Sequence, residues 1–231
     1  FTIISSMDNP AIFSGQRAFN YDNFVQAYIP YYQSLQNLLP KLIAGKMPVS
    51  DAPILVAGSG TGAELLSLAN RHPNWILEGI DPSPEMVVQA RDKLRNYNNV
   101  RLMEGYVSDL PLEPHYRAAT LLLVLHFVPD DGAKSSLLKE LANRMLPGAP
   151  LVILDIFGST TELAQNLEVL RAMMPPVADP EAVDNRLRTL PDRIEHVPEE
   201  RLYELLLNNG FSIPQRFFQA AIYGGWISKK L

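Results

Sequence analysis

The sequence predicts an α/β fold built on a mostly parallel sheet, and three observations support this class. Between residues 51 and 157, short apolar runs alternate with stretches of helical period. These runs are almost continuously apolar, as strands buried on both faces are. A glycine-rich turn follows the first run, where folds of this class bind nucleotides. The 231 residues, 47% hydrophobic and 19% charged, are enough for one large domain with its own core.

The expected elements follow one another in the order of a doubly wound sheet. We expect strands at 54–57, 75–80, 100–103, 120–125 and 150–156, and helices beginning near Gly62, Pro84 and Asp130. Ser83 and Pro84 are a typical N-cap and first helical residue, and Pro147-Gly148 is expected to end the third helix. Two further strands, 211–220 and 221–228, would form a hairpin.

On this pattern the chain divides into four parts. Residues 1–50 would form an N-terminal helical lid, of which residues 1–6 resemble an expression remnant, and residues 51–158 a Rossmann-like cofactor-binding core. Residues 159–209, interrupted by several prolines, would form a helical insert, and 210–231 the terminal hairpin. The complete expectation is a Rossmann-like, seven-stranded, mostly parallel sheet with a C-terminal antiparallel hairpin, an N-terminal lid and a helical insert before the last two strands.

The composition excludes several kinds of site. The chain has no cysteine, which rules out disulfides, thiolate catalysis and cysteine-ligated metals. Its four histidines form no HxH or HExxH pair, so no metal site is predicted. A net charge of −5 gives no general attraction to nucleic acid or anionic lipid. No apolar run approaches the roughly 20 residues of a membrane span, and no cleavable signal is recognisable, so we expect a cytoplasmic protein without membrane contact.

The strongest chemical signal is the glycine loop Gly58-Ser59-Gly60-Thr61-Gly62, between the first strand and the first helix. Glycines let the backbone turn tightly and approach a ligand that a Cβ would obstruct. Asp81 ends the second strand, where a carboxylate can accept both hydrogen bonds from a ribose 2′,3′-diol. Together they predict a site for an adenosine cofactor. The loop also satisfies the dinucleotide pattern GxGxxA through Ala63, so by itself it leaves NAD open.

Three segments resemble, in order and spacing, the class I S-adenosylmethionine-dependent methyltransferase family: Gly58-Ser-Gly-Thr-Gly62, Asp81-Pro-Ser-Pro-Glu-Met86 and Leu123-Val-Leu-His-Phe-Val-Pro-Asp130. The resemblance covers roughly residues 19–228. It implies S-adenosyl-L-methionine as cofactor, with S-adenosyl-L-homocysteine as its product. The cofactor-binding residues that it implies are Tyr32, Gly58, Ser59, Gly60, Asp81, Pro82, Met86, Tyr106, Val107 and Leu123. Many family members have an Asp where this chain has Tyr106.

A narrower resemblance is to the carboxy-S-adenosylmethionine synthase branch of that family. It rests on Tyr28-Ile-Pro-Tyr-Tyr32 and on the segment from Phe217 to Trp226. The chain departs from the branch at Leu122, where an Asn is expected, and only Arg186 and Arg188 approximate the arginine that reads the extra carboxylate. The branch therefore implies the layout, and its reaction stays an alternative to methyl transfer. An NAD-dependent oxidoreductase and a non-catalytic binding subunit are further alternatives.

Two residues are candidates for the chemistry. Methyl transfer is an in-line displacement, so aligning the reactants in a water-poor pocket supplies most of the catalysis. His126, just past the fourth strand, is the candidate general base for a protonated acceptor, with a loop-orienting role as the alternative. Asp155, at the end of the fifth strand, could bind an amine or assist proton removal, with a capped structural carboxylate as the alternative.

The methyl acceptor leaves few traces in the sequence. No Asn/Asp-Pro-Pro-Tyr segment follows the fourth strand, which disfavours a nucleic-acid acceptor, so we expect a small molecule held under the lid. The apolar-aromatic residues Phe217, Phe218, Tyr223 and Trp226 would lie either in the core or in the interface of a homodimer.

Overall fold

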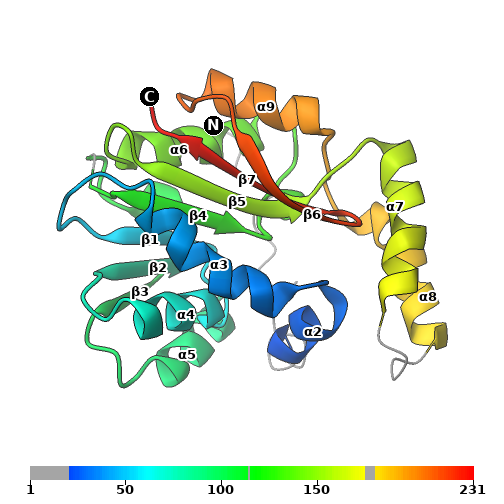
Figure 1. Ribbon diagram of the computed structural model, residues 1–231, viewed down its shortest axis with the longest axis horizontal. Helices are drawn as coiled ribbons and strands as arrows, with labels where there is room; N and C mark the ends of the chain where they lie inside the picture. The colour runs from blue at the N-terminus through cyan, green and yellow to red at the C-terminus, as the bar shows by residue number, and fades with distance from the viewer. Residues whose placement is uncertain (1–20, 114, 175–179) are drawn as a thin grey trace.

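The computed structural model describes residues 21–113, 115–174 and 180–231, which form a seven-stranded sheet with helices on both faces (Figure 1). The strand order is β3-β2-β1-β4-β5-β7-β6. β1 to β5 pair in parallel, and β7 pairs antiparallel with both β5 and β6. The order reverses between β1 and β4, so the carboxyl ends of these two strands flank the crevice where such sheets bind ligands.

The predicted α/β class, the seven strands and the terminal hairpin are confirmed. The strands are β1 (Ile54–Ala57), β2 (Leu77–Asp81), β3 (Val100–Glu104), β4 (Ala118–Leu122), β5 (Pro150–Ile156), β6 (Gln215–Ala220) and β7 (Tyr223–Lys229). The helices are α2 (Tyr21–Tyr28), α3 (Tyr32–Ala44), α4 (Ala63–Arg71), α5 (Pro84–Lys93), α6 (Ala133–Arg144), α7 (Thr160–Met173), α8 (Pro180–Thr189) and α9 (Glu199–Asn208), with short 3-10 helices η2 (Val107–Asp109), η3 (Leu125–Phe127) and η4 (Pro191–Arg193). The predicted cap of α5 is present, because the Ser83 hydroxyl accepts from the Met86 N–H at 3.3 Å.

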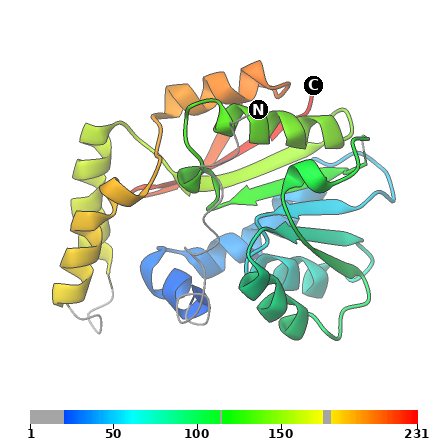
Figure 2. The same cartoon turned by 180° about the vertical axis from the view of Figure 1, so that it is seen from behind.

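Alternate residues of the strands face two cores on opposite sides of the sheet. Leu55 and Leu121 point to the side covered by α6 and α9, and Ile54 and Val56 to the side covered by α3, α4 and α5. Figure 2 shows α6 and α9 side by side above the sheet. Although α9 falls in the segment expected as an insert, it therefore covers the sheet beside α6.

The helices α2, α7 and α8 lie beyond the carboxyl ends of the parallel strands (Figure 1). A third apolar cluster joins them to the sheet and includes Val25, Leu163, Val183, Leu154 and Ile222. Of the expected lid and insert, α2, α7 and α8 thus lie at the end where the glycine loop opens, whereas α3 and α9 cover the sheet. Residues 1–20 and the prolines at 175 and 176 lie outside the described residues.

Several strand boundaries differ from the sequence-based expectation, among them the start of β6 at Gln215 instead of residue 211, and two of the differences have a visible physical reason. β4 ends at Leu122 rather than at residue 125, because the backbone of Leu123 turns to a φ of 60°, which a strand cannot continue. β2 begins at Leu77 rather than at Trp75, whose ring stacks on His72 at 3.7 Å in the turn that follows α4. Among the described residues, no helix combines the length and the apolar character needed to cross a membrane.

Candidate active site

A pocket of about 1080 Å³, its open mouth included, lies at the carboxyl ends of β1, β2 and β4. It collects segments that are far apart in the sequence: the glycine loop, the turns after β2 and β3, the loop after β4, and α2. Eight of the residues predicted to bind the cofactor line it, namely Gly58, Gly60, Asp81, Pro82, Met86, Tyr106, Val107 and Leu123. A cleft of this size with mostly apolar walls fits a nucleoside-sized ligand.

The glycine loop needs its glycines for two separate reasons. A Cβ at Gly58 would lie 2.4 Å from Cγ2 of Val124, so the loop could not approach the segment after β4 with any side chain there. At Gly60 a Cβ would meet nothing closer than Cε1 of Tyr21 at 4.0 Å. Gly60 lines the pocket, so a side chain would occupy ligand space. Both residues have positive φ, 71° and 50°, which favours glycine in addition.

Asp81 joins the two halves of the predicted cofactor site. Its Oδ2 accepts the Gly60 N–H at 2.8 Å, and its Oδ1 accepts the Ser83 N–H at 2.9 Å. Burial raises the pKa of Asp81, and these two backbone N–H groups act in the opposite direction. An ionised carboxylate has about four acceptor positions, so the side chain can still accept hydrogen bonds from a diol in the pocket.

Two of the predicted cofactor residues do not line the pocket. Tyr32 lines a separate polar groove between α3 and α4. Ser59 is buried, and its hydroxyl has no hydrogen-bond partner among the described residues. Tyr21, at the start of α2, lines the pocket in place of Tyr32. The sequence placed both tyrosines in the lid, and how α2 packs decides which ring reaches the site.

His126 and Asp155 lie behind the wall of the pocket, with 7% and 3% of their surfaces exposed. His126 Nδ1 is 2.6 Å from Oδ1 of Asp155. The same carboxylate accepts the backbone N–H groups of Val124 at 3.1 Å, Leu125 at 2.7 Å and Ile156 at 2.8 Å. Asp155 thus holds the loop that follows β4. These contacts fit the structural alternatives given above, a loop-orienting role for His126 and a capped carboxylate for Asp155.

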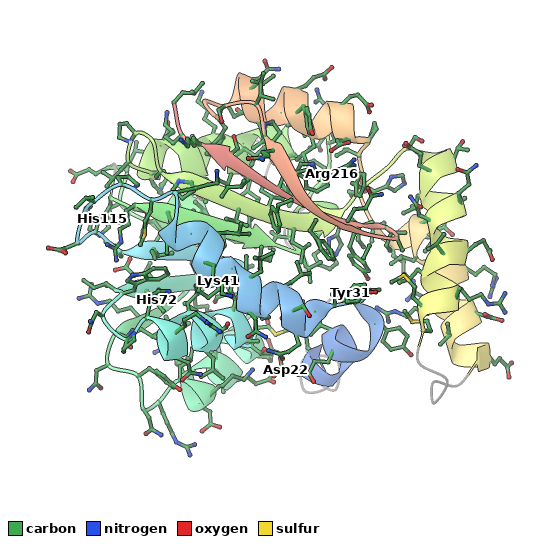
Figure 3. All side chains as sticks on the ribbon, in the orientation of Figure 1. Asp22, Tyr31, Lys41, His72, His115 and Arg216 are labelled. Atoms are coloured by element: carbon green, nitrogen blue, oxygen red, sulfur yellow. The ribbon has the colours of Figure 1, made fainter. Side chains whose placement is uncertain are left out.

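The lid helix α2 is fastened to the glycine loop by a polar contact. Asp22 accepts hydrogen bonds from the hydroxyl of Thr61 and from Nζ of Lys93, the latter at 2.5 Å. Lys93 also donates to the Thr61 hydroxyl at 3.1 Å. Figure 3 labels Asp22 on α2. The position of α2 is therefore tied to the glycine loop at Thr61.

One buried carboxyl was not singled out by its sequence. Glu64, the second residue of α4, directly follows the glycine loop and is 7% exposed. One of its carboxyl oxygens has no hydrogen-bond partner among the described residues. Burial raises its pKa from the ordinary 4.5 to about 7, and Thr120 on β4 pulls it in the opposite direction. The sequence signal for it is weak, since a Glu in the first turn of a helix is ordinarily an exposed partner of the helix dipole.

A metal has no support in the described residues. They contain no group of three or more His, Asp or Glu side chains arranged to hold an ion. Figure 3 shows His72 and His115 at the end of the sheet away from α2.

Residues 54–148, which contain the glycine loop, Asp81 and the loop after β4, match a family model described as a methyltransferase domain. This match shows a methyltransferase domain at residues 54–148, and the strand order with its antiparallel β7 agrees with the class I S-adenosylmethionine-dependent fold that the sequence resembles. Of the enzyme classes that the glycine loop left open, this is the one that the match supports.

Three relatives show the range of the likeness. The chain is 24% identical to a carboxy-S-adenosyl-L-methionine synthase from Actinobacillus succinogenes, over 91% of this chain and 89% of the relative. It is 26% identical to a trans-aconitate 2-methyltransferase from Mycobacterium tuberculosis, over 68% of this chain and 55% of that protein. Magnesium protoporphyrin IX methyltransferase from Synechocystis, solved with bound S-adenosylhomocysteine, shares the fold with a TM-score of 0.69 at 17% identity, over 96% of this chain and 98% of its own.

Proposed function

We propose that this chain transfers the methyl group of S-adenosylmethionine to a small-molecule acceptor in the pocket between α2 and the loop after β4. The observation that carries the proposal is the joining of Asp81 to Gly60 in the wall of this pocket. A bound S-adenosylmethionine supplies a methyl group that its positive sulfur makes electrophilic. The carboxylate suits a ribose diol, and the open space at Gly60 admits a ligand where a side chain would exclude it.

The other lining residues fit the remaining parts of the cofactor. Pro82 and Met86, from the turn after β2 and the start of α5, offer apolar surface for the adenine ring. Tyr106 and Val107 follow β3 on the same side. The adenine amino group would then bond to the backbone here, since the Asp that many family members have is Tyr106 in this chain. These roles are proposals for each residue.

The acceptor would occupy the part of the pocket nearest α2. Tyr21, Leu122 and Phe127 line this pocket with the glycine loop and give it mainly apolar walls. Such walls exclude water and hold a small molecule in line with the methyl group. The acceptor classes of the relatives include carboxylic acids such as trans-aconitate. A panel of small carboxylic acids is therefore a first choice for screening.

The catalytic roles of His126 and Asp155 stay a prediction. Their contacts with each other and with backbone N–H groups support a structural role instead. We propose that the reaction depends mainly on alignment, so that an acceptor whose reacting atom is already ionised needs no base. The pH profile of turnover tests this: a rate that follows the ionisation of the acceptor supports alignment, and a dependence that disappears in His126→Ala supports a histidine base.

The first experiment is the thermal midpoint with S-adenosylmethionine, S-adenosylhomocysteine or NAD added. A ligand at about 100 times its Kd adds about 2.7 kcal/mol, which is a rise of roughly 5 to 10 °C in a chain of this size. We expect the rise with the two adenosyl-sulfur ligands and none with NAD. Asp81→Asn should remove most of the rise, and Asp92→Asn, whose carboxylate is 78% exposed, should keep it. A rise with NAD alone would contradict the proposal.

A carboxy-S-adenosylmethionine synthase is the second candidate, favoured by the identity that extends over 91% of the chain. Arg186 on α8 lies 5.1 Å above the ring of Tyr28 on α2, between lid and insert, and Arg188 donates to Asn185 at 2.8 Å. A synthase would retain a cofactor heavier by one carboxyl group, visible in native mass spectrometry, and would lose it in Arg186→Ala or Arg188→Ala. A methyltransferase would retain unmodified cofactor in all three proteins.

Location and assembly stay predictions. We propose a cytoplasmic protein, which cell fractionation tests. Trp226 and Tyr223 lie in the core of the single chain, at 0% and 6% exposure. These two residues therefore cannot contribute to the dimer interface for which they were candidates. Light scattering after size-exclusion chromatography decides between one and two copies.

A further inference from the structure

The loop after β4 forms one wall of the pocket, and two buried ionisable side chains, Asp155 and Lys134, bond to its backbone. Asp155 accepts the backbone N–H groups of Val124 and Leu125. Lys134, on α6, donates to the carbonyl oxygen of Leu125 at 2.6 Å and to that of Val128. One carboxylate thus takes the N–H groups of the loop and one ammonium takes its carbonyl oxygens.

The third proton of Lys134 reaches beyond the loop. It is donated to the carbonyl oxygen of Glu195 at 2.6 Å, in the segment that links η4 to α9. The Glu195 N–H in turn donates to the carbonyl oxygen of His126 at 2.8 Å. The pocket wall and the segment after α8 are therefore joined by two hydrogen bonds, one of which depends on Lys134.

Burial and the position in the helix both oppose an ammonium here. Lys134 is 1% exposed and is the second residue of α6, where the positive end of the helix dipole opposes a cation. Burial lowers its pKa, and Asp155, Asp130 and Glu195 oppose that effect. A leucine would fill such a core position without this penalty. What the lysine adds is three directed hydrogen bonds.

We propose that Lys134 is a positioning residue that fixes the pocket wall and couples it to the segment that connects the insert to α9. The pocket is lined by residues of this loop, namely Leu123, Val124, Phe127 and Val128. A ligand that contacts them therefore also restrains the backbone at Glu195, through the hydrogen bonds of Lys134. The inference rests on the proposed cofactor site. It gives a role in binding to a lysine that does not itself line the pocket.

The test compares Lys134→Met, which keeps the length of the side chain without its donors, with Leu141→Ala in the same helix. Leu141 is fully buried in the core and has no part in the loop, so its variant matches the loss of stability alone. Lys139→Met, at an exposed position of α6, matches the loss of charge. S-adenosylhomocysteine binding is measured by calorimetry well below the unfolding midpoints. Hydrogen exchange is followed by mass spectrometry in peptides covering 122–128 and 190–197.

We expect Lys134→Met to weaken S-adenosylhomocysteine binding by about 10-fold, while both control variants stay within about 2-fold of the wild type. In the wild type the ligand should slow exchange at 190–197 by at least about 5-fold, although these residues do not line the pocket. Lys134→Met should abolish that slowing. If Lys134→Met does not fold, Lys134→Gln, which keeps two N–H donors, should fold and give an intermediate loss.

Equal loss of affinity in Leu141→Ala and Lys134→Met would overturn the inference, because stability alone would then explain it. Unchanged exchange at both peptides in free Lys134→Met would overturn it as well. A wild type that binds neither S-adenosylmethionine nor its product would instead contradict the proposed function. The exchange of the free proteins would still decide what Lys134 holds.

Discussion

Replacing Glu64 by glutamine should stabilise the protein at alkaline pH and leave it nearly unchanged at acid pH. The folded pKa of about 7 lies above the ordinary 4.5 because the carboxyl is buried. The folded state therefore keeps a proton between these two pH values that the unfolded chain has released. The free energy of unfolding falls as pH rises through this window, and the loss is complete above pH 7.

The size of the effect follows from the two pKa values. A difference from 4.5 to about 7 corresponds to about 3 kcal/mol, at 1.36 kcal/mol for each pKa unit. Since glutamine has no proton to lose, Glu64→Gln should be more stable than the wild type by about 3 kcal/mol at pH 8. At pH 5 the part of the difference due to ionisation should fall to about 1 kcal/mol or less. The thermal midpoint at pH 8 should rise by roughly 6 to 12 °C.

The assay is urea unfolding of both proteins at pH 5 and pH 8, with Glu168→Gln as the control. Glu168 is exposed in the middle of α7, so that variant changes the same charge in a helix without burial. The reasoning is refuted if the stability difference between Glu64→Gln and the wild type is the same at both pH values. It is also refuted if Glu168→Gln shows the same pH dependence.

Three further changes test the site. Gly58→Ala should lose the thermal shift with S-adenosylhomocysteine and should lower the thermal midpoint by more than Gly148→Ala does. Both glycines have positive φ, but only the Cβ added at Gly58 meets a neighbour, Val124 at 2.4 Å. If the histidine is a base, His126→Ala should lower turnover by about 100-fold. If the histidine only supports the loop, the fold-loss of turnover should be no larger than the fold-loss of cofactor affinity. Asp22→Asn should cost less than about 1 kcal/mol yet speed hydrogen exchange across α2, and an exchange rate equal to the wild type would show that the contact does not hold the lid.

Local sequence patterns predicted β1 and β5 well because these two strands are buried on both faces. The runs at 54–57 and 150–156 are strands with the predicted bounds. The end of β4 could not be predicted in the same way. The turn at Leu123 depends on the carboxylate of Asp155, a partner some 30 residues away on the next strand, so no local pattern indicates it.

The residues of the candidate site likewise fall into those that a local motif predicts and those that tertiary packing decides. Gly58, Gly60 and Asp81 could be found because their chemistry is written in one short motif each. Tyr21 could not be chosen over Tyr32, since both lie in one aromatic segment and the choice depends on how α2 packs.

Lys134 did leave a signal, because it occupies the same helix face as Leu138 and Leu141, at spacings of four and seven. A lysine on the apolar face of a predicted helix marks a buried cation that needs partners.

The place of β7 has a consequence for how the chain folds during synthesis. β7 pairs along the whole of β5, from Pro150 opposite Lys229 to Ile156 opposite Tyr223. A nascent chain that has emerged only as far as residue 222 therefore has the glycine loop and five parallel strands, but β5 presents an open edge to solvent or to a chaperone. Trp226, whose indole N–H donates to Glu199 at 2.8 Å, completes the core between the sheet and the helices α6 and α9 only when β7 has been synthesised. Ribosome-stalled chains ending before and after β7 should therefore differ sharply in protease resistance.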